Sequence, residues 1–211
     1  MSDLFGKSLK DVLKASASSE PVPGGGSVSA IVGAFAASMA AMVANLTIGK
    51  KKYRKVESQM VSLRDKALSL MSRSEELVDA DMGHFKKFIE YYKMPASTPE
   101  EEERKDHLIQ EALKDATETP LEIAQACLQV LETVVEMAPI GSKMAISDAG
   151  VAAYLADAAL KAALLNVDIN LPQIKDHEFA EKARGRKDAL IEKSNSLLAE
   201  SVSIVASRLG S

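Results

Sequence analysis

The sequence has no tryptophan, a single cysteine and few aromatic residues of any kind. Aromatic side chains make up 4% of the 211 residues, so the hydrophobic core has to consist of alanine, leucine, valine, isoleucine and methionine. This mixture favours helices over sheets, because β-strands are enriched in aromatic and β-branched residues. The lone cysteine, Cys127, excludes a disulfide within the chain. Since the sequence also lacks a secretory leader pattern, we expect a reducing, cytoplasmic location.

The chain also lacks an excess of positive charge and a long uninterrupted apolar run. It carries 26 basic and 30 acidic residues, a net charge of −4, whereas nucleic-acid-binding proteins usually have a basic excess. The most apolar stretch, residues 28–48, is rich in alanine and is interrupted by serine and asparagine. We therefore expect neither a nucleic-acid partner nor a membrane span. With 46% hydrophobic and 27% charged residues, the composition is typical of a folded globular domain.

Prolines are few, and they divide the chain into windows. Helix interiors do not tolerate proline, and between the seven prolines apolar residues recur every three or four positions. The windows that we expect to be helical are residues 28–48, 56–92, 121–135, 151–164 and 179–205. The second would be about 60 Å long at 1.5 Å per residue. We predict an all-α fold: a single domain, residues 1–211, forming a bundle of six to seven helices with one very long helix.

Two short motifs predict where helices begin. Thr98-Pro99-Glu100-Glu101 and Thr119-Pro120-Leu121-Glu122 each place threonine at the N-cap, proline at the first helical position and glutamate at the third. This arrangement is a capping box, in which the threonine and glutamate side chains satisfy backbone N–H groups at the start of a helix. We therefore expect one helix to begin at Pro99 and another at Pro120.

A glycine-rich turn precedes the first apolar helix. Two prolines stiffen the approach, Gly24, Gly25 and Gly26 carry no side chains, and Ser27 stands where an N-cap residue belongs. Bare amides at a helix N-terminus can bind an anion or a polarised oxygen. The alternative is a tight turn that only starts the helix. The turn is not a P-loop, which would end in Gly-Lys-Ser/Thr, and Ser29 occupies the third glycine position of a dinucleotide fingerprint.

A basic segment follows the same helix. Five of the six residues from Lys50 to Lys55 are basic, with Lys50 and Lys51 at its start. Such a segment suits a polyanion or a ligand with several carboxylates. The alternative is a solvated joint between two helices, where cations are favourable near a helix C-terminus.

Asp81 is the carboxylate that stands out. It lies on the apolar stripe of the long predicted helix, four residues after Leu77 and four before Phe85, whereas Asp79 is expected to face solvent. A carboxylate on an apolar stripe is costly unless it is paired or functional. Burial would raise its pKa into a range suited to proton transfer. A purely structural hydrogen bond is the alternative.

The remaining polar candidates lie around the fourth predicted helix. Asp148 follows a turn and opens that helix, where it is either a second functional carboxylate or an ordinary N-cap. Asn166 and Asn170 lie near its end and either line a pocket or terminate the helix. The three histidines are scattered without metal-ligand spacing, so we expect no metal site. Cys127 stands among leucines and is expected in the core.

Several of these segments resemble one family in collinear order. They are Pro-Gly-Gly-Gly-Ser-Val at 23–28, Met-Val-Ala-Asn-Leu-Thr at 42–47, Leu-Val-Asp-Ala-Asp at 77–81, Ser-Asp at 147–148 and Asn-Val at 166–167 with Ile-Asn-Leu at 169–171. The family comprises the C-terminal domain of formiminotransferase-cyclodeaminase and the stand-alone methenyltetrahydrofolate cyclohydrolases. One departure is Gly141-Ser142, where the family commonly has Gly-Asn.

The resemblance implies an all-α homodimer that acts on one-carbon tetrahydrofolates, without a cofactor beyond the folate itself. Two reactions occur in the family: hydrolysis of 5,10-methenyltetrahydrofolate to the 10-formyl form, and closure of N5-formiminotetrahydrofolate to the methenyl form with loss of ammonia. Because the chain lacks the transferase half, we favour the cyclohydrolase and keep the cyclodeaminase as the alternative. A non-catalytic folate-binding or helical scaffold protein is a third hypothesis.

Motif position and residue type together suggest roles within such a site. We expect Asp81 to be the acid/base and Asp148 to be a second carboxylate or an orienting group. The turn from Gly24 to Ser27 would hold the pterin or the reacting carbon, and Asn166 and Asn170 would bind substrate. Lys50 and Lys51 would bind the glutamate tail.

Overall fold

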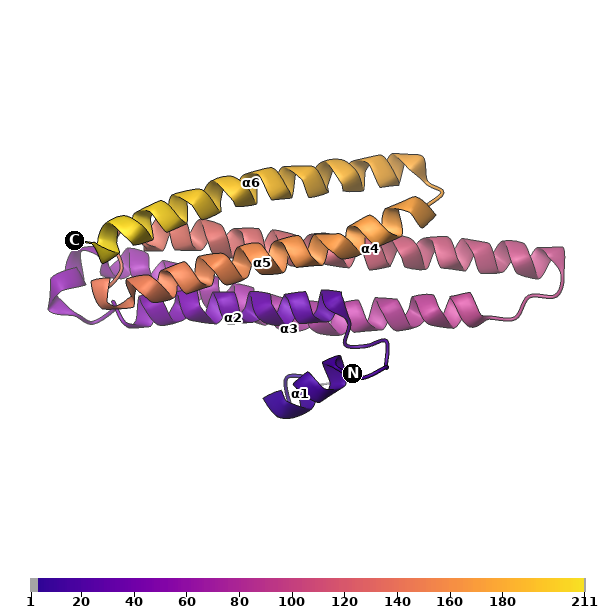
Figure 1. The fold of residues 1–211 in the computed structure, drawn as a ribbon, viewed down its shortest axis with the longest axis horizontal. Coiled ribbons are helices and arrows are strands. Elements are labelled where there is room, and N and C mark those ends of the chain that lie inside the picture. The colour runs from indigo at the N-terminus through magenta and orange to yellow at the C-terminus, as the bar shows by residue number, and fades with distance from the viewer. Residues whose placement is uncertain (1–3, 211) are drawn as a thin grey trace.

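The computed structural model describes residues 4–210, and in that range the chain is helical without a strand (Figure 1). Six α-helices occur there: α1 (Leu9–Ser16), α2 (Gly25–Asn45), α3 (Glu57–Lys93), α4 (Pro99–Met137), α5 (Ile146–Asn170) and α6 (His177–Leu209). Short 3-10 turns, Lys51–Val56, Lys143–Ala145 and Leu171–Gln173, lie beside α3, α5 and α6. The all-α prediction is confirmed, including the very long helix, although α4 is longer still. The ends of the predicted domain, residues 1–3 and 211, lie outside the described residues.

Helices α2 to α6 run along one common direction and form an elongated bundle, while α1 lies outside it next to the start of α2 (Figure 1). Helix α2 packs against α3, α4 and α5. Small residues allow this close packing, because a Cβ at Gly33 would lie only 2.9 Å from the Cys127 sulfur. The alanines on the inner side of α2 are buried: Ala30, Ala34, Ala36, Ala37, Ala40, Ala41 and Ala44. The expectation that residues 28–48 form a core helix is thus confirmed, with the helix beginning at Gly25.

The predicted helix start at Pro120 is wrong, because α4 continues through this proline from Pro99 to Met137. A proline inside a helix leaves the carbonyl four residues earlier without its donor. Here that carbonyl, on Ala116, accepts a hydrogen bond from the Asn170 side chain at 2.9 Å. Thr119 does not cap a helix, and its hydroxyl donates to the Asp115 carbonyl at 3.1 Å. The capping box at Thr98 and Glu101 is confirmed.

Helices α2 and α5 run antiparallel, which gives the bundle two distinct ends. At one end, a Cβ on Gly25 would lie 3.7 Å from the Asn166 side-chain oxygen, so α2 begins where α5 finishes. At the other end, the Lys50 ammonium lies 3.5 Å from the Ser142 hydroxyl, just before α5 begins. The 21 residues of α2 separate these ends by about 30 Å at 1.5 Å per residue.

Two helices are long and apolar enough to span a membrane by length and composition alone, namely α2 and the segment Lys143–Gln173. In the folded chain, 61% and 56% of their most apolar windows are buried. A buried core helix passes the same composition test, so this finding is weak evidence for a membrane span. Both helices instead contribute their small residues to the bundle core.

Candidate active site

Asp81 extends from the middle of α3 to the first turn of α2. Its carboxylate accepts a hydrogen bond from the Ser27 hydroxyl at 2.6 Å, and the glycine at position 26 makes the approach possible. Asp81 itself is half-buried, between the buried Leu77 and the half-buried Phe85, and Asp79 is exposed as expected. The sequence therefore places a carboxylate at the amide-rich start of a core helix, a position that favours negative charge.

The prediction that Ser27 is the N-cap of α2 is wrong. Gly24 is the N-cap residue and makes no side-chain capping bond, while Ser27 lies fully buried in the first turn. The carboxylate of Asp81 takes over part of the missing cap, because it accepts hydrogen bonds from the hydroxyl and the backbone N–H of Ser27. Such a cap from another helix leaves no mark in the local sequence.

Burial is the main influence on the acidity of Asp81, and it raises the pKa of the carboxyl above the usual aspartate value. The two hydrogen bonds from Ser27 and the nearby charge of His84 lower the pKa but do not cancel the effect of burial. Asp81 is therefore held in place by donors and at the same time kept easier to protonate than an exposed aspartate. Both properties suit a group that takes up and returns a proton.

Asp81 lines a small cavity of about 70 Å³ between α3, α4 and the end of α5. The other lining residues are His84, Phe85, Ala116, Thr119, Asn166, Ile169 and Asn170. Two of the predicted binding residues, Asn166 and Asn170, are thus brought to the Asp81 carboxylate, and Gly25 lies next to Asn166. The Asn166 amide nitrogen donates to the Ala163 carbonyl at 3.2 Å, and Asn170 satisfies the carbonyl that Pro120 leaves open.

His84 belongs to this site, although the sequence analysis treats it as an unremarkable histidine. Its Nδ1 lies 2.7 Å from the Thr119 hydroxyl oxygen. Because the Thr119 proton is donated to the Asp115 carbonyl, the Thr119 oxygen acts as acceptor and His84 Nδ1 carries a proton. In the neutral ring, Nε2 then has the free lone pair. The spacing contains the signal, because residues three apart on a helix share a face.

The other expected carboxylate, Asp148, lies at the opposite end of the bundle. It is half-buried in the first turn of α5, where Ala145 and not Asp148 is the N-cap residue. Asp148 precedes Asn166 by 18 residues on one helix, which is about 27 Å. Within one chain, Asp81 and Asp148 therefore cannot contact the same reacting carbon, and the expectation of a single site containing both is wrong for one chain.

Lys50 and Lys51 lie at that same far end, and both are exposed. Lys50 lines a cleft of about 530 Å³ together with Lys52, Tyr53, Ser142, Lys143 and Met144. The Tyr53 hydroxyl accepts the backbone N–H of Lys143 at 3.1 Å, and this bond is the main reason for the lowered pKa of Tyr53. The backbone N–H of the buried Ser142, the position that departs from the family, donates to the Thr47 hydroxyl at 2.7 Å.

No group of three His, Cys, Asp or Glu side chains among residues 4–210 could hold a metal ion. Cys127 is buried in the core as expected, and burial raises the pKa of its thiol to about 12. At such a pKa the thiol stays protonated and is a poor nucleophile. The groups that could do chemistry at the α2 start are therefore Asp81 and His84.

Comparison with known proteins places this geometry in a family. The family model described as formiminotransferase-cyclodeaminase matches residues 8–189, which is most of the chain. The chain belongs to this family. A methenyltetrahydrofolate cyclohydrolase from Methylorubrum extorquens is 37% identical over 191 residues, covering 90% of this chain and 92% of that protein.

Two further family members bracket the chain in size. The formimidoyltransferase-cyclodeaminase of Mus musculus is 33% identical over 191 residues, but these cover only 35% of that longer protein. A crystal structure of formiminotetrahydrofolate cyclodeaminase from Thermotoga maritima superposes with a TM-score of 0.87 at 28% identity. It covers 97% of this chain and 98% of that one, so the two share the all-α fold from end to end.

Proposed function

We propose that this protein is a 5,10-methenyltetrahydrofolate cyclohydrolase, with Asp81 as its acid/base. The observation that carries the proposal is the half-buried Asp81 carboxylate, held by Ser27 on the wall of a small cavity at the start of α2. The Methylorubrum relative supports the substrate, because it carries the cyclohydrolase name and matches this chain over nearly its whole length. A scaffold protein would not need a carboxylate with a raised pKa beside an amide-rich helix start.

The chemistry begins with the methenyl carbon, which bridges N5 and N10 in an amidinium-like cation. A water oxygen bonds to this carbon while Asp81 takes one proton of the water, giving a neutral tetrahedral adduct. The carbon–N5 bond then breaks as N5 receives a proton and the remaining hydroxyl proton leaves. The products are 10-formyltetrahydrofolate and one proton released to solvent. Before attack, the negative charge of Asp81 also balances the substrate cation.

His84 is the second group that can move a proton in this site. Thr119 fixes its ring, so that Nε2 is the free nitrogen, and His84 shares the cavity with Asp81. We assign His84 to the proton that N5 receives while Asp81 holds the proton from water. Two groups with separate tasks avoid the need for one carboxylate to protonate and deprotonate in the same step.

The cyclodeaminase reaction is the second candidate, and the Thermotoga structure favours it because that protein is a formiminotetrahydrofolate cyclodeaminase of the same length and fold. Ring closure passes through a tetrahedral carbon between N5 and N10, from which ammonia leaves in place of water. Asp81 and His84 could serve both reactions, so the distinction depends on which substrate binds. We favour the cyclohydrolase on the higher identity of the Methylorubrum relative.

The test is direct, because the methenyl form has its own absorbance. Purified protein is mixed separately with 5,10-methenyltetrahydrofolate and with 5-formiminotetrahydrofolate, and released ammonia is assayed in parallel. Enzyme-dependent loss of methenyl absorbance without ammonia supports the cyclohydrolase. A gain of methenyl absorbance with matching ammonia from the formimino substrate, and no hydrolysis, would assign the cyclodeaminase instead. No turnover of either compound would support a binding or scaffold role.

The remaining parts of the assignment are also proposals. We propose that residues 1–211 act as one domain, that the protein works in the cytoplasm and that it forms a homodimer. Tetrahydrofolate serves as substrate and no further cofactor takes part. The polyglutamate tail of the substrate would meet Lys50 and Lys51, which carry exposed charge beside the larger cleft.

A further inference from the structure

Helices α2 and α5 expose large apolar side chains on the outside of the bundle. They are Val28, Phe35, Met42 and Leu46 on α2, and Val151, Tyr154, Leu165 and Ile169 on α5, with exposed fractions of 38–68%. The two helices pack against each other, so these side chains form one surface, here called the α2–α5 face. Monomeric proteins rarely leave so many large apolar residues together in water, and such patches usually mark an interface.

The exposed residues of the α2–α5 face are arranged symmetrically. On α5, Val151 and Leu165 lie seven residues on either side of the exposed Ala158. On α2, Val28 and Met42 lie seven residues on either side of Phe35. Since Gly25 is beside Asn166, these two midpoints are at nearly the same height along the bundle. A two-fold axis in the interface that crosses both helices at their midpoints would therefore match apolar residue to apolar residue.

We propose that a second copy of this chain binds the α2–α5 face in antiparallel orientation, and that each active site is completed by the other copy. The two-fold axis would place the partner's Lys50 and the partner's Asp148 beside the cavity that holds Asp81. This inference rests on the proposed function and adds to it where the substrate lies: the reacting carbon at Asp81 of one copy, and the carboxylate tail at the basic cleft of the other.

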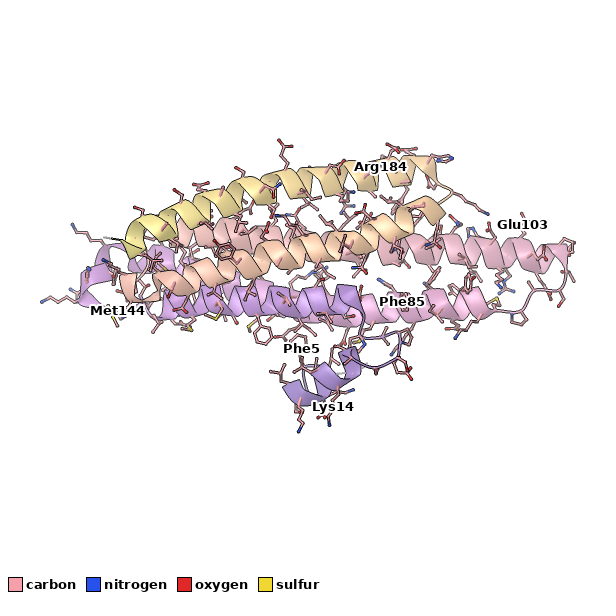
Figure 2. All side chains as sticks on the ribbon, viewed as in Figure 1. Phe5, Lys14, Phe85, Glu103, Met144 and Arg184 are labelled. Atoms are coloured by element: carbon pink, nitrogen blue, oxygen red, sulfur yellow. The ribbon has the colours of Figure 1, made fainter. Side chains whose placement is uncertain are left out.

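The sizes of the two cavities support a shared site. The Asp81 cavity measures about 70 Å³, whereas pockets for drug-sized ligands usually measure about 300–1,000 Å³. The cleft at Lys50 measures about 530 Å³ but contains no acid/base pair. Both border the α2–α5 face, because Ile169 lines the first and is 68% exposed, and Met144 lines the second and is 89% exposed. Figure 2 shows Met144 at one end of α5 and Phe85, which lines the Asp81 cavity, far along the bundle from it.

Electrostatics favours the antiparallel orientation over the parallel one. A parallel dimer would place the two basic segments, residues 50–55, next to each other, and their like charges would repel. The antiparallel dimer separates them by about 30 Å, which exceeds the Debye length of about 8 Å at physiological salt. It also brings each basic segment toward the carboxylate of Asp81 in the other copy.

Disulfide cross-linking tests the orientation, since the native Cys127 is buried and does not interfere. In the antiparallel dimer, Ala158→Cys should cross-link with itself under oxidation, and a mixture of Val151→Cys with Leu165→Cys should cross-link between the two variants. Val151→Cys alone should not, because its two copies would be about 21 Å apart along the helix and a disulfide needs a Cα separation of about 4.4–6.8 Å. Self-cross-linking of Val151→Cys, or no cross-link at any of these positions, would overturn the proposal.

A charge exchange at the axis tests whether the partner completes the site. Ala158→Glu and Ala158→Lys each place like charges together across the axis, so each should sediment as a folded monomer with at least tenfold lower turnover. Mixing them pairs opposite charges and should restore dimers and activity. Ala199→Glu, at an exposed alanine of α6, is the matched control and should stay active and dimeric.

The outcomes separate this proposal from the proposed function. Fully active Ala158→Glu monomers would show that one copy holds a complete site, whatever the reaction. If the parental protein turns over neither folate, the proposed function fails, while the cross-links still report the orientation of the dimer. A parental monomer that binds phosphatidylcholine vesicles would assign the α2–α5 face to a lipid surface and overturn the proposal.

Discussion

Gly26 and Asp81 approach each other so closely that no other residue fits at position 26. A Cβ added to Gly26 would lie 2.1 Å from Oδ1 of Asp81, far inside contact distance. The missing side chain therefore lets a carboxylate from α3 lie against the first turn of α2. This contact, and not conformational freedom of the backbone, is the structural reason for a glycine at this position.

Gly26→Ala should therefore disable the site without unfolding the protein. The new methyl group would force the Asp81 carboxylate away from Ser27, and we expect turnover to fall at least 10²-fold, as after the loss of a general acid/base. Steady-state kinetics and circular dichroism measure both effects. Gly83→Ala is the control, since nothing lies within 4 Å of its Cβ position and alanine should stabilise the helix by about 0.5–1 kcal/mol. Near-parental activity of Gly26→Ala would contradict the assigned position of Asp81.

His84→Asn should lower kcat more than it changes KM. The asparagine amide can still donate to Thr119 as Nδ1 does, but nothing replaces Nε2, the nitrogen assigned to the proton for N5. We expect a loss of about 10²-fold or more in kcat. His107→Asn, at an exposed histidine of α4, should leave both constants unchanged. If the His84 and His107 variants behave alike, His84 takes no part in proton transfer.

The raised pKa of Asp81 has a consequence for stability. Between the ordinary aspartate pKa of about 3.9 and the higher folded value, the folded state binds a proton that the unfolded state has lost. Stability contributed by Asp81 is therefore present at low pH and decreases as pH rises through that window. Asp81→Asn removes this loss, so its free energy of unfolding at neutral pH should exceed that of the parent, and the difference should vanish below about pH 4.

Urea unfolding at several pH values measures this difference. Asp79→Asn, at the exposed neighbouring carboxylate, is the control and should show no such pH-dependent gain. A lower stability of Asp81→Asn at neutral pH would mean that the carboxylate is mainly a structural cap for α2.

Lys50→Ala with Lys51→Ala should weaken binding of polyglutamylated folate more than binding of the monoglutamate. The basic cleft would attract the extra carboxylates, and added salt should reduce the difference because it screens exposed charges. The KM for both substrates is measured at low and at physiological salt. Equal effects on both substrates would assign these lysines to the joint between α2 and α3.

The helices were predictable because their signals are local. Apolar spacing and the Thr98 capping box report on neighbours three or four residues away, and the long helix follows from them. Pro120 misleads for the opposite reason, since the donor that satisfies the freed Ala116 carbonyl is Asn170, 54 residues further along the chain. No local pattern contains that information.

The site divides along the same line. Asp81 could be selected from the sequence because a carboxylate on an apolar stripe is anomalous by itself. Its partner could not, because the distance between Asp81 and Asp148 depends on the antiparallel packing of α2 and α5. The true neighbour, His84, was one helical turn away, but a histidine in a helix is common and only the contact with Thr119 distinguishes it.

The most direct test of the account is the turnover of Asp81→Asn with 5,10-methenyltetrahydrofolate. The substitution keeps the size of the side chain and its ability to hydrogen-bond with Ser27, but removes the titrating carboxyl. We predict a folded protein whose kcat is about 10²–10⁴ lower, with substrate affinity within about tenfold of the parent. A folded Asp81→Asn protein with near-parental turnover would contradict the central claim that this carboxylate moves the proton.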